Sequence, residues 1–179
     1  MPDLSPQLHA IAISGSPRAP SKSRLLAELL LRAFEKTSGA TTHVIDVADL
    51  PAEALLARAP SSVIDEAIAA IGDANIVIAA TPTYRALYTG ALKCLFDLMP
   101  PGHLRGKACI PVQTAASPAH FLAVEYGLRP LFESLEGLPV PGVYATDDQF
   151  EDGQPNERLS QRIDQVALAA ATLARAMGA

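Results

Sequence analysis

Five short apolar runs alternate with five helical patterns along this chain, and that alternation limits its possible folds more than any other feature. The middle run, at 76–80, is continuously apolar, which is typical of a strand buried on both faces of a parallel sheet. Strands that alternate with helices predict a doubly wound parallel sheet with right-handed crossovers. The expected strands are 8–14, 42–47, 75–81, 108–114 and 140–146, and the expected helices are 23–37, 61–72, 90–98, 118–136 and 156–176.

Chain length and strand number then define the architecture. A chain of 179 residues, of which 49% are hydrophobic and 18% charged, can bury a sizeable core, and no repeat or linker divides it. We therefore expect a single α/β domain over residues 1–179, with a five-stranded parallel sheet in the flavodoxin-like order 2-1-3-4-5. That order sets the first and third strands side by side, and ligands bind outside the carboxyl ends of strands at such a point.

Charge and cysteine content argue against several functional classes. A net charge of −5 disfavours a surface for nucleic acid or anionic membrane, and no apolar run approaches the ~18 residues that span a bilayer. Residues 1–6 have no basic region and no long apolar stretch, so we expect no signal peptide and a cytoplasmic protein. Cys94 and Cys109 form no CxxC motif and are expected to be reduced thiols, and the four histidines lack metal-ligand spacing, so we expect no metal site.

The first expected strand runs into a loop rich in hydroxyl groups. Residues 14–24 contain four serines and two arginines and lead into a helical pattern. A strand, a small polar loop and a helix N-terminus direct backbone N–H groups at one point, where the helix dipole adds positive potential. We therefore interpret this segment as a phosphate site, with the candidates Ser14, Ser16, Arg18, Ser21, Ser23 and Arg24.

This loop differs from the commoner phosphate-binding motifs. It lacks the Gly-x-Gly-x-x-Gly of dinucleotide sites and the Gly-Lys-Ser/Thr of P-loops. A loop in which hydroxyls supply most of the contacts suits a terminal phosphate monoester, as in flavin mononucleotide (FMN). An ordinary loop with a serine N-cap would explain one serine, but not four hydroxyls and two arginines in so short a segment.

The loop after the third strand tests this interpretation, because the expected strand order places it beside the first loop. It reads Thr81-Pro-Thr-Tyr-Arg-Ala-Leu-Tyr-Thr-Gly90. Pro82 makes the loop rigid and leaves the following N–H groups for a ring carbonyl, and Tyr84 offers an aromatic contact and a hydroxyl. Tyr84 and Tyr88 would equally serve to cap the sheet, since tyrosines are common at such rims. The loop after the fourth strand, 114–118, would form the other wall of the site.

Four blocks of residues, spread over most of the chain, carry a resemblance to a known family. The blocks are Gly15-Ser-Pro-Arg-Ala-Pro-Ser-Lys-Ser23, then Thr81-Pro-Thr-Tyr84 with Gly90-Ala-Leu-Lys-Cys-Leu-Phe-Asp97, then Leu104-Arg-Gly-Lys107, and finally Ala119-His-Phe-Leu-Ala-Val-Glu-Tyr-Gly-Leu-Arg-Pro130. They resemble the flavodoxin-fold NAD(P)H-dependent FMN reductases. The last block is similar in particular to the reductase components of two-component alkanesulfonate and methanesulfonate monooxygenases.

The resemblance implies an enzyme that transfers hydride from NADPH or NADH to FMN. It also implies that the chain supplies reduced FMN to a flavin-dependent monooxygenase in sulfonate or organosulfur assimilation. Hydride transfer requires no general acid or base, so no catalytic residue is expected. The expected cofactor-binding residues are Ser16, Arg18, Ser21, Ser23 and Arg24 in the first loop, Thr81, Pro82, Thr83 and Tyr84 in the third-strand loop, and Thr114, Ala115, Ala116 and Ser117 in the fourth.

The chain departs from the family pattern in its fourth loop. The family has Thr-Gly-Gly-Ser/Thr where this chain has Thr114-Ala-Ala-Ser117. Each alanine adds a methyl group and restricts φ, so we expect one wall of the flavin pocket to be crowded.

Two other functions fit the same site residues. An FMN-bound quinone, azo or metal-ion reductase would share the site, and only the 119–130 block favours the FMN reductase over it. A non-enzymatic electron carrier of the flavodoxin type is disfavoured, because such carriers are more acidic and hold FMN with a tryptophan and a tyrosine, and this chain has no tryptophan.

The expected helix at 118–136 carries more large apolar residues than one buried stripe needs. We therefore expect a homodimer or homotetramer formed through this helix, with Tyr126 near the subunit contact. Pro130 should kink the helix, and the resemblance implies a local π-bulge at Tyr126.

Overall fold

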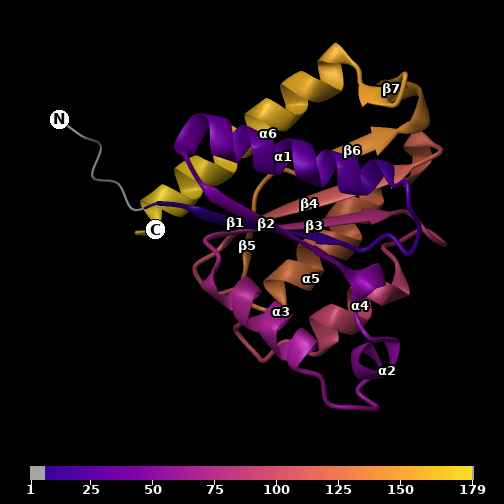
Figure 1. Cartoon of the computed structure of the whole chain (residues 1–179). Helices are drawn as coiled ribbons and strands as arrows, with labels where there is room; N and C mark the ends of the chain where they lie inside the picture. Colours follow the sequence, from indigo (N-terminus) through magenta and orange to yellow (C-terminus); the bar gives the residue numbers. More distant parts are fainter. Residues whose placement is uncertain (1–6, 179) are drawn as a thin grey trace.

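The computed structural model describes residues 7–178 and has three layers, with a parallel sheet between two layers of helices (Figure 1). The strands of the main sheet are β1 His9–Ser14, β2 Thr41–Asp46, β3 Ile76–Pro82, β4 Ala108–Ala115, β5 Leu138–Pro139 and β6 Val143–Thr146. The α-helices are α1 Lys22–Ser38, α2 Ala52–Leu55, α3 Ser62–Asp73, α4 Gly90–Asp97, α5 Arg129–Glu133 and α6 Glu157–Ala176. Residues 1–6, on which the expected absence of a signal peptide rests, lie outside the described part.

The sheet has the strand order that the sequence predicts. Its order is β2-β1-β3-β4-β5, and β1 lies between β2 and β3 with every pairing parallel. The last residues of neighbouring strands are in register, with Ser14 opposite Ala80 and Pro82 opposite Thr114. The carboxyl ends of β1, β3 and β4 therefore meet at one edge, and the flavodoxin-like α/β fold is confirmed.

The fifth strand differs from the expected continuous strand at 140–146. It is divided into β5, which pairs with the start of β4, and β6, which pairs with the end of β4. Between them, Gly142 lies so close to Pro111 of β4 that an added Cβ would be 2.4 Å from the Pro111 carbonyl oxygen. Because Pro111 and Pro141 also lack an N–H group, regular pairing is interrupted here and resumes at Val143.

Two clusters of buried apolar side chains hold the layers together, one on each face of the sheet. Alternate residues of β1 point to opposite faces, so Ala10 and Ala12 pack beneath α1 and α6, whereas Ile11 and Ile13 pack against α3 and α4. Helices α1 and α6 each bury one apolar stripe, as their three- and four-residue spacing predicts. The buried residues of the two stripes are Leu26, Ala27, Leu30, Leu31 and Phe34 in α1 and Leu159, Ile163, Val166, Ala167, Ala170, Ala171 and Ala174 in α6.

The prediction of a single helix at 118–136 is wrong. The segment forms a 3-10 turn, η2 (Pro118–His120), a π-helix, η3 (Val124–Leu128), and then α5. Gly127 of the π-helix lies against Leu87 of the third-strand loop, where an added Cβ would be 2.8 Å from Leu87 Cδ2. Pro130 stands in the first turn of α5, where its missing N–H is tolerated. The π-helical geometry around Tyr126 agrees with the implication of the resemblance.

Several short elements complete the described chain. A 3-10 turn, η1 (Val47–Asp49), follows β2, and another, η4 (Asp147–Gln149), precedes a small hairpin of β7 (Phe150–Glu151) and β8 (Gln154–Pro155). Within residues 7–178, no helix combines the length and the apolar character that crossing a membrane requires.

Candidate functional site

The loop between β1 and α1 forms the first wall of the candidate site. It lies at the carboxyl edge of the sheet and ends at Ser21, the N-cap of α1, whose hydroxyl accepts from the Arg24 N–H at 3.3 Å. Ser23 is fully buried in the first turn, and its hydroxyl lies 3.0 Å from that of Ser21. The first turn of the helix thus brings two hydroxyls together where its free N–H groups and its dipole favour an anion.

The two arginines of this loop have different surroundings. Ser16 Oγ donates to the Arg18 carbonyl at 2.9 Å and accepts from the Arg18 N–H at 3.3 Å, which fixes the backbone that carries the Arg18 side chain. Arg24 instead donates to Glu28 at 3.0 Å and to Asp46, at the end of β2. The sequence placed Arg24 with the phosphate-binding residues, but two carboxylates hold its guanidinium.

Two hydrogen bonds hold the first loop beside β3 and the third-strand loop, as the strand order predicts. The Gly15 N–H donates to the Ala80 carbonyl at 2.7 Å, and the Thr89 hydroxyl donates to the Gly15 carbonyl at 2.6 Å. Thr89 is also the N-cap of α4, and its own N–H donates to Thr81 Oγ1 at 3.1 Å. An added Cβ at Gly15 would be 2.7 Å from Leu92 Cβ, so this close approach requires glycine. The buried Thr81 hydroxyl therefore supports the loop itself.

The third-strand loop is joined in turn to the end of β4, and the loop after β4 is joined to β6. The Thr83 N–H donates to the Thr114 carbonyl at 2.7 Å, and Gln113 Nε2 donates to Thr83 Oγ1 at 2.9 Å. The Tyr144 hydroxyl donates to the Ser117 carbonyl, and partial burial raises the pKa of Tyr144, which favours the protonated donor. Each of the three loops thus has its position set by the neighbouring strands.

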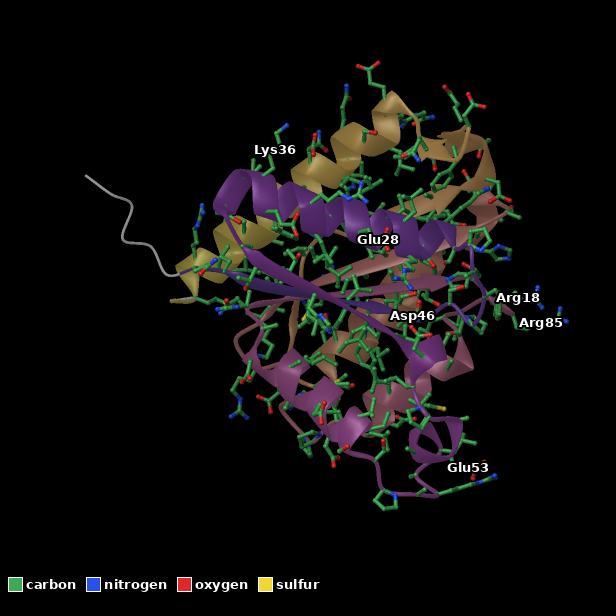
Figure 2. The ribbon with its side chains drawn as sticks, in the orientation of Figure 1. Arg18, Glu28, Lys36, Asp46, Glu53 and Arg85 are labelled. Atoms are coloured by element: carbon green, nitrogen blue, oxygen red, sulfur yellow. The ribbon has the colours of Figure 1, made fainter. Side chains whose placement is uncertain are left out.

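A cavity of about 410 Å³ opens between the first loop and the third-strand loop and is lined by Arg18, Thr83, Tyr84 and Arg85. Figure 2 shows Arg18 and Arg85 projecting together at the edge where the strands end. None of the ion pairs within residues 7–178 includes Arg18 or Arg85. Two positive charges without acidic partners therefore face a cavity beside the N-terminus of a helix, which suits an anionic ligand.

The tip of the third-strand loop is a tight turn with an unusual backbone. Tyr84 and Leu87 exchange two backbone hydrogen bonds, and both residues between them, Arg85 and Ala86, have positive φ angles of 49° and 76°. Residues other than glycine are strained at positive φ, and such strained residues are concentrated at functional sites. The turn presents Arg85 to the cavity.

A second cavity of similar size lies near the amino ends of β1 and β2. It measures about 400 Å³ and is lined by His9, Thr41, His43 and Asp73, among others. The Asp73 carboxylate would repel a phosphate, and no loop of hydroxyls leads into a helix there. The cavity at the carboxyl edge therefore suits a phosphorylated ligand better.

The structure gathers most of the expected site residues, although their exposure differs. The first group, from the β1–α1 loop and the first turn of α1, is Ser16, Arg18, Ser21 and Ser23. The second, from the end of β3 and the loop after it, is Thr81, Pro82, Thr83 and Tyr84, and the third, from the end of β4 and the loop after it, is Thr114, Ala115, Ala116 and Ser117. Ala116 is exposed, Ser117 caps η2 through the Ala119 N–H, and neither alanine has a positive φ. No group of three or more His, Cys, Asp or Glu side chains within residues 7–178 is placed to hold a metal ion.

Sequence reasoning missed four residues that shape the site: Arg85, Thr89, Gln113 and Tyr144. Two of them had a readable signal. Thr89 stands directly before a helical pattern, which is the position of an N-cap, and Gln113 is a lone amide within an apolar strand pattern. The roles of Arg85 and Tyr144 depend on the turn conformation and on a contact across 27 residues of sequence.

The fold and the site together define a protein of the flavodoxin-like class, in which a phosphorylated flavin is bound at the carboxyl ends of the strands. Residues 8–152 match the model of the family described as NADPH-dependent FMN reductase, and the chain belongs to that family. It is an oxidoreductase whose family uses FMN together with NADPH or NADH.

Individual relatives agree with this assignment. The chain is 38% identical over 149 residues to an FMN reductase (NADPH) of Escherichia coli strain K12, covering 81% of this chain and 76% of the relative. It is 35% identical over 175 residues to an NADH-dependent FMN reductase, SfnF, of Pseudomonas fluorescens strain Pf0-1, covering 95% and 94%. The crystal structure of an NADH:FMN oxidoreductase, EMOB, in its apo form superposes with a TM-score of 0.84 at 36% identity, covering 92% of this chain and 90% of the other.

The donor groups at the carboxyl edge fit FMN. A helix N-terminus, several hydroxyls and an arginine without an acidic partner are the donors that a phosphate monoester requires. Ser14 Oγ and Gln113 Oε1 are both buried without a hydrogen-bond partner among the described residues, near the ends of the strands that support this site. Unpaired buried polar atoms cost stability, so their place beside the loops is consistent with a functional site.

Proposed function

We propose that this protein is an NAD(P)H-dependent FMN reductase that releases reduced FMN to a flavin-dependent monooxygenase. The observation that carries the proposal is the cavity between the first loop and the third-strand loop, lined by two arginines without acidic partners, together with the hydroxyl-rich N-terminus of α1 to which the first loop leads. The name of the SfnF relative supports FMN reduction with NADH, and that of the Escherichia coli relative supports NADPH. We further propose that the partner monooxygenase acts in sulfonate or organosulfur assimilation, as the 119–130 block implies.

In this proposal each loop has a separate task. Ser16, Arg18, Ser21 and Ser23 bind the phosphate, whereas Arg24 balances Glu28 and Asp46 and contributes to the site only through the potential of its charge. The backbone after Pro82 and the side chains of Thr83 and Tyr84 orient the flavin ring. Thr114, Ala115, Ala116 and Ser117 form the opposite wall.

The chemistry is hydride transfer, and the flavin supplies its electronics. The chain contributes binding, orientation and hydrogen-bond donors near the part of the ring where negative charge accumulates on reduction. No side chain has to exchange a proton with the nicotinamide carbon. The rigid hydrogen-bonded loops therefore act by holding both reactants in position.

The apolar surface of residues 121–126, which connect η2 to η3 and begin η3, supports an oligomer. The large side chains at its centre are exposed to 55% at Phe121, 45% at Leu122 and 76% at Tyr126. Gly127 of the same segment contacts Leu87 of the third-strand loop. We propose a homodimer or homotetramer formed through this surface, with the flavin sites close to the subunit contact.

Two further properties complete the proposal. We propose that residues 1–179 form one flavin-binding domain, since both core clusters and all three site loops belong to the same sheet. We also propose a cytoplasmic location, where a flavin-dependent partner and reduced nicotinamide nucleotides are both present.

Acceptor assays under nitrogen test this function against the quinone or azo reductase and against the electron carrier. With NADPH or NADH in excess, the protein should reduce many equivalents of free FMN per subunit, and the reduced FMN should pass through a dialysis membrane into a second compartment, where a monooxygenase can use it once oxygen is admitted. Turnover of quinones far faster than FMN would support the alternative reductase. Protein that retains FMN but shows no nicotinamide oxidation would support the electron carrier.

A further inference from the structure

Gln113 is a polar residue near the carboxyl end of β4, after an apolar run of that strand. It is completely buried, and it lies in register with Thr81 of β3 and Tyr144 of β6. Its Nε2 donates to Thr83 Oγ1 at 2.9 Å, whereas its Oε1 has no hydrogen-bond partner within the described residues. A buried amide with one end unpaired destabilises a fold, and an apolar side chain of similar size would avoid that cost. The amide at this position therefore indicates a role other than packing.

The hydrogen-bond partner of Gln113 is Thr83. This half-buried residue lines the cavity of the candidate site, and two consecutive β4 residues hold it, Thr114 through the backbone and Gln113 through the side chain. A hydroxyl has one hydrogen and two lone pairs. Because Gln113 donates to the Thr83 oxygen, the hydroxyl hydrogen is left for another acceptor, and no described residue takes it.

The opposite orientation of the amide would reverse this hydrogen bond. Thr83 would then donate to Gln113 Oε1, and both hydrogens of the amide nitrogen would be left without a partner in a buried position. The observed orientation leaves Oε1 and one amide hydrogen without a partner among the described residues, and it keeps the Thr83 hydrogen available.

We propose that Gln113 is a positioning residue that turns the Thr83 hydroxyl into a hydrogen-bond donor for the ring of bound FMN. This inference rests on the proposed function. Reduction increases the negative charge of the flavin around N1 and the C2 carbonyl, and a hydrogen bond to a charged acceptor is stronger than one to a neutral acceptor. The Gln113–Thr83 pair therefore favours reduced FMN over oxidised FMN, and it makes FMN easier to reduce at this site.

Equilibrium binding of both forms of FMN to the full-length protein, under nitrogen, tests the inference. Gln113→Leu and Thr83→Val should each weaken binding of reduced FMN by about tenfold and change binding of oxidised FMN by less than about threefold. A tenfold loss of affinity for reduced FMN relative to oxidised FMN makes the midpoint potential of the bound flavin about 30 mV more negative, for a two-electron couple. The double variant should resemble either single variant, because the two side chains act through one hydrogen bond.

Thermal unfolding of the apoprotein separates this role from packing. Gln113→Leu removes the unpaired oxygen, so its Tm should stay the same or rise although reduced FMN binds more weakly. Thr83→Ser keeps a hydroxyl and should recover most of the lost preference for reduced FMN. Gln161→Leu and Thr172→Val on the exposed face of α6 make the same chemical changes away from the site and should leave the preference unchanged.

Three outcomes would overturn the inference. They are a lower Tm for Gln113→Leu with equal weakening of both flavin forms, an unchanged preference in Thr83→Val, and full additivity in the double variant. Failure of the proposed function is a separate result, because it would appear as absence of FMN binding or of FMN reduction by the unmodified protein.

Discussion

Burial controls the chemistry of Cys109. This residue of β4 is fully buried, and an added Cβ at Gly137 would be 2.6 Å from its sulfur. Burial raises the pKa of its thiol from 9.0 to about 12, so the nucleophilic thiolate does not form at neutral pH. Cys109 therefore acts as a small apolar side chain of the core.

Alkaline unfolding should report this shift. The thiol pKa is higher in the folded state than in the unfolded state, so its contribution to stability is complete below about pH 9 and is lost as the pH rises toward 12. Between these values the free energy of unfolding should fall by up to about 1.4 kcal/mol per pH unit through this group. Urea unfolding at several pH values should show a shallower alkaline decline for Cys109→Ala than for the unmodified protein. Parallel declines would contradict this assignment.

Ala115, at the end of β4, and Ala116, directly after it, give a second prediction. Neither Ala115 nor Ala116 has a positive φ, so both alanines suit their backbone and glycine would only add freedom to the unfolded chain. The double change to glycine should lower the free energy of unfolding by about 1–2 kcal/mol. It should also tighten FMN binding, because two methyl groups leave the wall of the proposed pocket. Unchanged or weaker binding in a fluorescence titration would show that the alanines do not crowd the flavin.

The sequence predicted those helices and loops whose structure depends on contacts between residues close together in the chain. The first loop and α1 were predictable because the serines, the N-cap and the apolar stripe lie within one continuous segment. Its neighbouring third-strand loop followed from strand order alone. The division of the fifth strand was not predictable, because it depends on the contact between Gly142 and Pro111. The π-helix likewise depends on packing against Leu87, and the charge partners of Arg24 in α1 include Asp46 at the end of β2.

The hydroxyls at the start of α1 should distinguish FMN from riboflavin. Replacing both Ser21 and Ser23 by alanine should weaken FMN binding by at least tenfold and barely affect riboflavin, since only FMN carries the phosphate. The change also removes the N-cap of α1, which costs about 1 kcal/mol of stability. Asn156→Ala removes the cap of α6 away from the site and serves as the matched control. Equal weakening of both ligands would show that this loop does not bind phosphate.

The surface of the whole molecule predicts assembly. Sequence reasoning found an excess of apolar residues at 118–136, and the structure shows which of them the core does not cover, with Phe121, Leu122 and Tyr126 remaining exposed. Burying these side chains in a contact between copies would remove a large apolar patch from water.

Sedimentation at micromolar protein tests the oligomer. The unmodified protein should sediment at two or four times its chain mass of 18.8 kDa, and Phe121→Glu with Tyr126→Glu should shift it toward the monomer. Glutamate in place of Leu168, another exposed apolar residue, should leave the oligomer intact. A single 18.8 kDa species for the unmodified protein would rule the assembly out.

The division of the fifth strand also affects whether another chain can add to the edge of the sheet. A long, regular outer strand offers a row of free N–H and C=O groups to which another chain can add, and such addition can continue into fibrils. Here the outer strand beside β4 consists of two short pieces, and Pro139 and Pro141 provide no N–H to an incoming strand. Growth of the sheet from one molecule into the next is therefore disfavoured on this side of the molecule.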